Sequence, residues 1–309
     1  MSETAEVWIT GIGLATSLGE GLDANWDALQ ARRINVDEKG FAPYVVHPFA
    51  PVNLDAQIPK KGDQRQMEAW QRIGTYAAGL ALDSAGVKGN KEILGRMDMI
   101  VAAGGGERDL AVDSNILNLA AQGNAAPGFL NERLMNDLRP TLFLAQLSNL
   151  LAGNIAIVHG VTGSSRTFMG EEAASIDAAR IALARIAGGQ SDIALIGGSQ
   201  NGERKDLLVL YEFGDFNLRG KFEPVWARAG HGGFALGFTG GLELLEQGEV
   251  FLEAAIDALL VEGQEFDAFG FAREGTGGGQ CGVDFGVVSV DVGCVIGEAE
   301  GEDVVFDGG

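Results

Sequence analysis

Residues 160–200, GVTGSSRTFMGEEAASIDAARIALARIAGGQSDIALIGGSQ, decide the fold that we predict for this chain. Residues 167–169 predict a short buried strand, and the two acids that follow open a helix of small residues that runs to residue 186. Residues 193–196 predict a second strand, closed by a glycine pair at 197–198. A helix that connects two strands is typical of parallel strands in one sheet.

The same alternation of strands and helices extends toward both ends of the chain. A helix of residues 68–85 is stopped by Gly86, and the run at 142–152 is apolar almost all round, so we expect it to be a buried helix. The remaining expected elements are strands at 7–10, 99–103, 234–238 and 242–245, the last two as a strand pair, and a helix around 22–29. This order predicts an α/β layered domain with a mostly parallel sheet over residues 1–250.

A glycine turn at residues 11–13 follows the first expected strand and is similar to the start of a dinucleotide-binding fingerprint. Thr16 stands where that fingerprint needs its third glycine. No acidic residue is identifiable at the ribose-binding position after a second strand. We therefore do not expect this chain to bind a nucleotide.

Composition and charge exclude several classes of partner. The chain has 309 residues, 22 Lys and Arg against 43 Asp and Glu, and a formal net charge of -21. Such a surface repels phosphate backbones, so we expect no nucleic-acid partner. No run of about 18 apolar residues is present, and the N-terminus lacks the basic and then apolar pattern of a signal peptide. We expect no membrane insertion and a cytoplasmic location.

The composition changes near the C-terminus, and we treat residues 251–309 as a separate acidic segment rich in glycine and valine. Residues 275–309 contain eleven Gly, eight Val, four Asp, three Glu and one Ala, all of which have codons that begin with G. The segment is therefore either a flexible acidic tail or the product of a shifted reading frame. Cys281 and Cys294 lie within it and match neither a disulfide framework nor a zinc-site spacing.

Several segments, read in order, resemble the β-ketoacyl-acyl-carrier-protein synthase family of condensing enzymes, which has the thiolase fold. VWITGIGLATSLGEGLDANWDAL at 7–29 is similar to the opening strand, glycine turn and first helix of that family. Residues 160–200 are similar to its central strand, nucleophile turn, buried helix and following strand, and FEPVWARAGHGGFALGFTGGLELLE at 222–246 to the segment that closes its N-terminal half. The resemblance covers about residues 5–248. It implies a thiolase-like layered α/β fold with a complete N-terminal half and a largely missing C-terminal half, of which residues 251–309 would be a degenerate remnant.

The resemblance also implies where the active site should lie. The family has a cysteine at the tip of the strand-to-helix turn, where the helix N-terminus helps to hold a thiolate and to form an oxyanion hole. Aligned without gaps from Gly163 through Gly198, that position is Glu172. The same helix terminus favours a carboxylate, but a glutamate cannot form the thioester that transacylation requires. The alternative is that Glu171 and Glu172 are ordinary acids of a first helical turn.

The histidines of the family are also absent from their expected place. The C-terminal half of the family supplies two histidines that stabilise the decarboxylating malonyl unit, whereas this chain has no histidine after Glu246. We expect His47, His159 and His231 to be surface or helix-capping residues rather than general bases.

Three functional hypotheses follow from this resemblance. The first is a non-catalytic partner subunit of the chain-length-factor kind, acting in fatty acid or polyketide chain elongation. It would dock an acyl carrier protein and form a homodimer or a heterodimer with an active synthase. The second is an active condensing acyltransferase or a malonyl-carrier-protein decarboxylase. The third is a truncated or frame-shifted synthase without function, whose exposed apolar face would promote aggregation. None of the three implies a metal ion or an organic cofactor.

Overall fold

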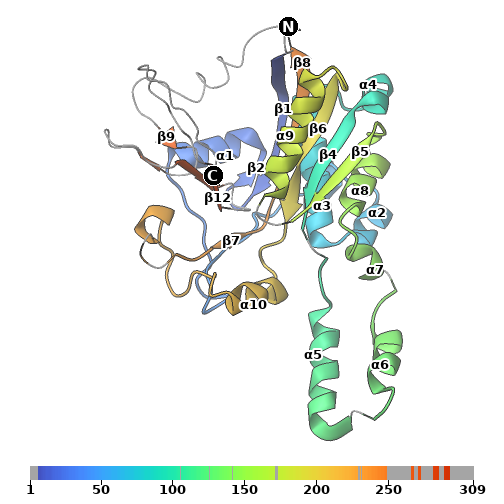
Figure 1. Cartoon of the computed structure of the whole chain (residues 1–309), viewed down its shortest axis with the longest axis vertical. Helices are drawn as coiled ribbons and strands as arrows, with labels where there is room; N and C mark the ends of the chain where they lie inside the picture. Colours follow the sequence, from blue (N-terminus) through green and yellow to red (C-terminus); the bar gives the residue numbers. More distant parts are fainter. Residues whose placement is uncertain are drawn as a thin grey trace, which may run out of the picture.

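The computed structural model describes residues 6–248, except 105, 125, 141, 171, 172, 229 and 231, together with four short strands, β9 (Phe266–Asp267), β10 (Phe271–Ala272), β11 (Cys281–Asp284) and β12 (Ser289–Val292). Its centre is a six-stranded sheet in the order β2-β1-β8-β6-β4-β5 (Figure 1). The strands are β1 (Glu6–Thr16), β2 (Gly19–Glu20), β4 (Asp98–Ala103), β5 (Ser165–Met169), β6 (Ile193–Gln200) and β8 (Thr239–Gly248).

The long strands of this sheet mostly run in one direction. β6, β4 and β5 pair in parallel, and β8 is antiparallel to both β1 and β6. β1 therefore has the same direction as β6, and β8 alone opposes the other long strands. The prediction of an α/β domain with a mostly parallel sheet is confirmed.

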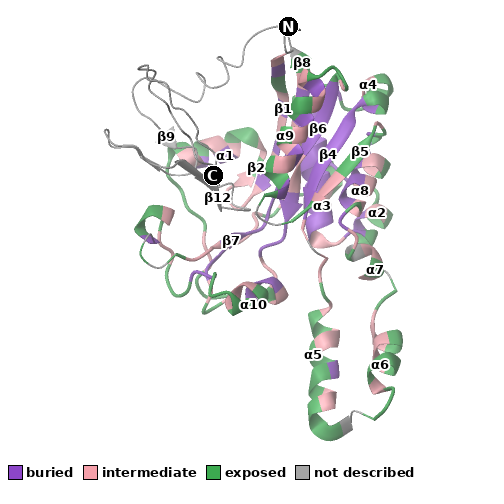
Figure 2. Cartoon of the chain, viewed as in Figure 1, coloured by how far each residue is buried: buried purple, intermediate pink, exposed green. Residues whose placement is uncertain are grey.

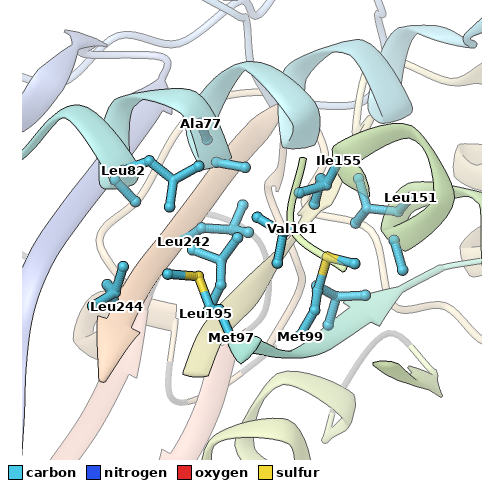
Figure 3. Packing of buried hydrophobic residues seen from close by; sticks show 14 of the residues in the cluster. Ala77, Leu82, Met97, Met99, Leu151, Ile155, Val161, Leu195, Leu242 and Leu244 are labelled. Atoms are coloured by element: carbon cyan, nitrogen blue, oxygen red, sulfur yellow. The ribbon is translucent and has the colours of Figure 1, made fainter. Parts of the chain in front are cut away.

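Helices cover both faces of the sheet. On one face, α3 (Ala69–Ser84) and α8 (Leu150–His159) pack against β1, β8, β6 and β4. Their apolar side chains meet those of the strands in the main core, where Leu82 and Ile155 lie above Met99, Leu195 and Leu242 (Figure 3). On the other face, α9 (Ala174–Ala187) packs its alanines on the same strands.

The remaining elements lie around this central sandwich. They are α1 (Gly21–Gln30), β3 (Val46–His47), η1 (Leu54–Ala56), α2 (Lys61–Gln66), α4 (Lys91–Arg96), α5 (Leu110–Leu119), η2 (Ala120–Asn124), α6 (Phe129–Asp137), α7 (Leu142–Ala145), α10 (Lys205–Phe213), η3 (Val225–Arg228) and β7 (Leu236–Gly237). Figure 2 shows that burial is concentrated in the sheet and α3, whereas α5 and α6 are mostly exposed.

The expected glycine turn at residues 11–13 is wrong, because β1 continues through it. Gly11 and Gly13 face α3, and a Cβ on Gly13 would lie 2.1 Å from the carbonyl oxygen of Ala77. These glycines let a helix approach a strand closely, which is a packing role rather than a phosphate-binding one.

The expected helix at 142–152 is also wrong. α7 ends at Ala145, and α8 begins at Leu150 after a turn. The two pieces have different surroundings, since Phe143 is 68% exposed and Leu151 is fully buried. A uniformly apolar run does not reveal such a break.

Three strand predictions also need correction. β5 is an edge strand, paired within the described part of the chain with β4, and its Met169 is 72% exposed rather than buried. β6 is not closed by Gly197 and Gly198 but continues to Gln200. β7 pairs with β3 in parallel instead of with β8, so residues 234–238 and 242–245 do not form a strand pair.

Candidate functional site

Three parallel strands end side by side at one edge of the sheet. Met169 of β5 is aligned with Ala103 of β4, and Ala103 is aligned with Ser199 of β6. In α/β sheets, ligands bind outside the carboxyl ends of the strands. The residues that follow these three strands therefore form the candidate site.

The turn after β5 is the part of this edge to which the sequence assigns the active-site position. Gly170 follows the strand with a φ of +139°, a conformation that favours glycine. Glu171 and Glu172 lie outside the described residues, so the structure leaves the position of Glu172 untested. α9 begins at Ala174, and its N-cap, Ala173, has no side-chain acceptor for the first N–H groups of the helix. Such a terminus favours an anion.

The loops after β4 and β6 are joined by polar contacts. The Asn201 side-chain amide donates to Glu107 Oε1 at 2.9 Å, although the two residues are 94 positions apart in the sequence. Asn201 is buried. The second loop also holds residue 49, because the Phe49 N–H donates to the Glu203 carboxylate at 2.6 Å.

Arg204 makes the second connection between these loops. Its guanidinium donates to the Gly106 carbonyl at 2.8 Å and to both carboxylate oxygens of Asp206, at 2.6 and 3.2 Å. Burial alone would raise the pKa of Asp206, but the hydrogen bonds and charge of Arg204 outweigh it, and this pKa lies below its ordinary value. Sequence reasoning missed these residues, since nothing in the sequence pairs a glutamate at 107 with an asparagine at 201.

The two histidines with described positions contact backbone carbonyl oxygens outside these three loops. His159 ends α8, and its Nε2 lies 2.8 Å from the carbonyl oxygen of Thr75 on α3. His159 is buried, so the expectation of a surface position is wrong for it. His47 Nδ1 lies 2.8 Å from the Asn35 carbonyl oxygen. His231 lies outside the described residues.

The buried histidine makes stability depend on pH. Burial lowers the pKa of His159 from 6.5 to about 4. Between these values the unfolded chain binds a proton that the folded chain does not bind, so the free energy of unfolding should fall by about 3 kcal/mol as the pH drops from 6.5 to 4. Urea unfolding at several pH values measures this loss. In His159→Gln, the free energy of unfolding should no longer fall in this way between pH 6.5 and 4. If it falls as steeply as in the parent protein, His159 is not the group responsible.

A buried ion pair fixes α9 to the sheet. The Arg185 guanidinium, in the last turn of α9, donates to Asp98 Oδ2 at 2.7 Å, and Ser164 Oγ donates to Asp98 Oδ1 at 2.8 Å. Burial would raise the pKa of Asp98, but the hydrogen bonds from Arg185 and Ser164 outweigh it and lower this pKa. The helix that follows the candidate site is thus held at its far end by charge.

Asp98→Ala should lower the free energy of unfolding by about 3 kcal/mol, because it leaves the mostly buried Arg185 guanidinium without its counter-charge. Chemical denaturation followed by circular dichroism measures the loss. Asp192→Ala is the matched control, since Asp192 pairs with Arg96 at the surface and its side chain is 67% exposed. We expect less than about 1 kcal/mol from the control, and equal losses in both variants would contradict the assignment.

Comparison with known proteins identifies this architecture. The model of the β-ketoacyl synthase N-terminal domain matches residues 4–249 of the chain. The chain belongs to the β-ketoacyl synthase family. A curated relative, 3-oxoacyl-[acyl-carrier-protein] synthase 2 of Vibrio harveyi, is 23% identical over 256 residues, which are 79% of this chain and 58% of the relative.

Solved structures of ketosynthases have the same fold as this synthase homologue. A β-ketoacyl synthase from Burkholderia phymatum superposes with a TM-score of 0.61 at 20% identity, covering 82% of this chain and 61% of that one. The ishigamide ketosynthase/chain length factor superposes with a TM-score of 0.59 at 20% identity, covering 82% and 60%. The expected ketosynthase-like α/β fold is confirmed. The chain spans about three fifths of the length of these relatives.

Two further features of the synthase homologue concern only its described residues. There, no helix combines the length and the apolar character that crossing a membrane requires. No cluster of three or more His, Cys, Asp or Glu residues in that part could hold a metal ion.

Proposed function

We propose that this synthase homologue is a non-catalytic partner subunit in fatty acid or polyketide chain elongation, comparable to a chain length factor. The observation that carries the proposal is Glu172, which aligns with the family's nucleophilic cysteine just before the N-terminus of α9, whose N-cap residue, Ala173, has no polar side chain. A helix terminus stabilises a carboxylate there. A carboxylate forms no thioester with an acyl group, so the chain would keep the architecture of a synthase without its acyl transfer.

Two exposed features support association with a second chain. β5 lies at the edge of the six-stranded sheet, and such an edge offers backbone groups to another strand. The segment of residues 110–145, which we call the arm, comprises α5, η2, α6 and α7 and extends away from the sheet (Figure 1). Its Leu117, Leu130 and Met135 are exposed, and exposed apolar groups of this kind are typical of interaction surfaces.

An open groove at the base of the arm supports a role in holding an acyl chain. It has a volume of about 590 Å³, and its lining includes Leu134, Leu138 and Phe143, the last of which is 68% exposed. Apolar walls of this kind suit a hydrocarbon chain. Arg108 and Arg139 also line the groove, where they pair with Asp113 and Glu68. The carrier of the acyl chain would be an acyl carrier protein.

Co-expression with an active β-ketoacyl synthase of the same genome tests the partner role. We expect the two chains to elute together from a sizing column, and the pair to give products of a different length from those of the synthase alone. Met135→Glu should abolish co-elution, because it puts a charge on the arm. Phe213→Glu on α10 is the matched control, since Phe213 is 86% and Met135 84% exposed.

Other outcomes would support the other hypotheses. A chain that elutes as a monomer beside every synthase tested would refute the partner role. Release of carbon dioxide from malonyl-carrier protein by the chain alone would indicate a decarboxylase instead. Broad, non-cooperative thermal unfolding would favour a truncated synthase, because a folded partner subunit should unfold in one sharp transition.

A further inference from the structure

The arm has little packing to hold it against the rest of the molecule. α5 packs mainly against η2 and α6, and the major neighbours of the sheet strands, in the described part of the chain, are α3, α8 and α9 rather than α5 or α6. Figure 1 shows α5 and α6 projecting well beyond the sheet. The direction of the arm must therefore be set at its two ends, by residues 106–109 before α5 and by residues 138–149, which include the last eight residues of the arm.

Glu107 connects both ends of the arm to the body. Its carboxylate accepts a hydrogen bond from the buried Asn201 amide at 2.9 Å, which ties the first end of the arm to the loop after β6. Its backbone carbonyl accepts a hydrogen bond from the Gln146 side chain, which lies just beyond α7 at the second end. One residue thus links both ends of the arm and the candidate site.

Two arginines reinforce these connections. Arg204, whose side chain is mostly buried, donates to the Gly106 carbonyl at 2.8 Å and is itself held by Asp206. Arg139, at the second end of the arm, pairs with Glu68 at the start of α3. Because these bonds involve charged groups, they are stronger and more directional than bonds between neutral groups.

We infer that Glu107 and Arg204 are positioning residues that hold the arm in one direction relative to the candidate site. The inference rests on the proposed function in one respect, namely that the arm meets a partner synthase. A fixed arm would present its apolar residues in a geometry ready for binding, which lowers the entropy lost on association. The same bonds hold the loops after β4 and β6 together, so the arm is tied to that part of the candidate site.

The direction of the arm can be measured on the chain without any partner. Spin labels at Leu117→Cys on α5 and Leu183→Cys on α9, in a Cys281→Ser and Cys294→Ser background, report the distance between arm and body. We expect a single narrow distance distribution, and a width at least doubled by Glu107→Ala. Glu132→Ala is the matched control, because it removes an exposed carboxylate from the arm itself and should leave the width unchanged.

A Glu107→Ala distribution as narrow as that of the parent protein would overturn the inference. Should this variant fail to fold by circular dichroism, Asn201→Asp replaces it, since it sets one carboxylate against another with almost no change of shape. Its distribution should also broaden, and an unchanged width would overturn the inference in the same way. Failure of the parent to bind any synthase, with the broadening still observed, would refute the proposed function and leave the positioning role intact.

Discussion

Gly13→Ala should destabilise the protein by about 3 kcal/mol or more, although it adds one methyl group. The new Cβ would lie 2.1 Å from the carbonyl oxygen of Ala77 and 2.4 Å from the backbone nitrogen of Ala81. Both obstacles are backbone atoms of α3, so no side chain can rotate to make room. The helix would have to move away from β1 and open the core that α3 shares with β8 and β6.

Urea unfolding followed by circular dichroism measures this loss. Gly95→Ala is the matched control, because nothing lies within 4 Å of a Cβ at this position in α4. The control should be neutral, or more stable by about 0.5–1 kcal/mol, since alanine favours a helix more than glycine does. A Gly13→Ala protein as stable as the parent would show that α3 does not approach β1 as closely as described.

The elements that sequence reasoning predicted well are those in which local pattern and burial agree. Residues 68–85 have helical periodicity and end at a glycine, and the helix runs from Ala69 to Ser84. Residues 99–103 are uniformly apolar, and β4 is buried throughout. In such segments the hydrophobic pattern reflects the same core that stabilises the folded chain.

The predictions failed where a distant contact decides the structure. In a short stretch of sequence, two nearby glycines suggest a turn. Gly11 and Gly13 instead lie inside β1, where the absence of a Cβ lets α3 pack closely against the strand. The apolar residues at 142–152 read as one helix, yet the chain bends where Gln146 turns toward Glu107. The contacts with α3 and with Glu107 join segments far apart in the sequence, so neighbouring residues alone do not predict them.

In the candidate site, too, local sequence patterns indicate one part and give no signal for another. The sequence predicts strand, turn and helix as one continuous segment around residues 171–172, and β5 and α9 flank that turn, while the position of Glu172 in it stays a prediction. The contacts of Asn201 with Glu107 and of Arg204 with Gly106 join residues more than 90 positions apart. Polar pairs at such separations have no periodic signal, so only the folded chain reveals them.

If the chain is a non-catalytic partner subunit as proposed, Glu172→Cys should give it the ability to take up an acyl group. In a Cys281→Ser and Cys294→Ser background, the parent should keep its mass when incubated with an acyl-carrier protein. The variant should gain the mass of one acyl group, because the N-terminus of α9 would lower the pKa of the introduced thiol and favour the nucleophilic thiolate. Intact-protein mass spectrometry reads both results directly. Glu171→Cys is the matched control and should gain less, since the alignment puts it one residue from the nucleophile position.

Acylation of that variant should not lead to condensation. General acid–base groups typically contribute 10²- to 10⁴-fold to a rate, and this chain has no histidine after Glu246 to supply them. We therefore expect condensation at least about 100-fold slower than with an active synthase, measured as product formed from malonyl-carrier protein. Rapid condensation would show that another residue replaces the family's histidines. An acyl adduct on the unaltered chain would identify Cys281 or Cys294 as a nucleophile and return the catalytic hypothesis to first place. Acylation without condensation would separate the effect of the missing nucleophile from that of the missing histidines. The variant would then have a nucleophile for the first step but no groups that catalyse the later condensation.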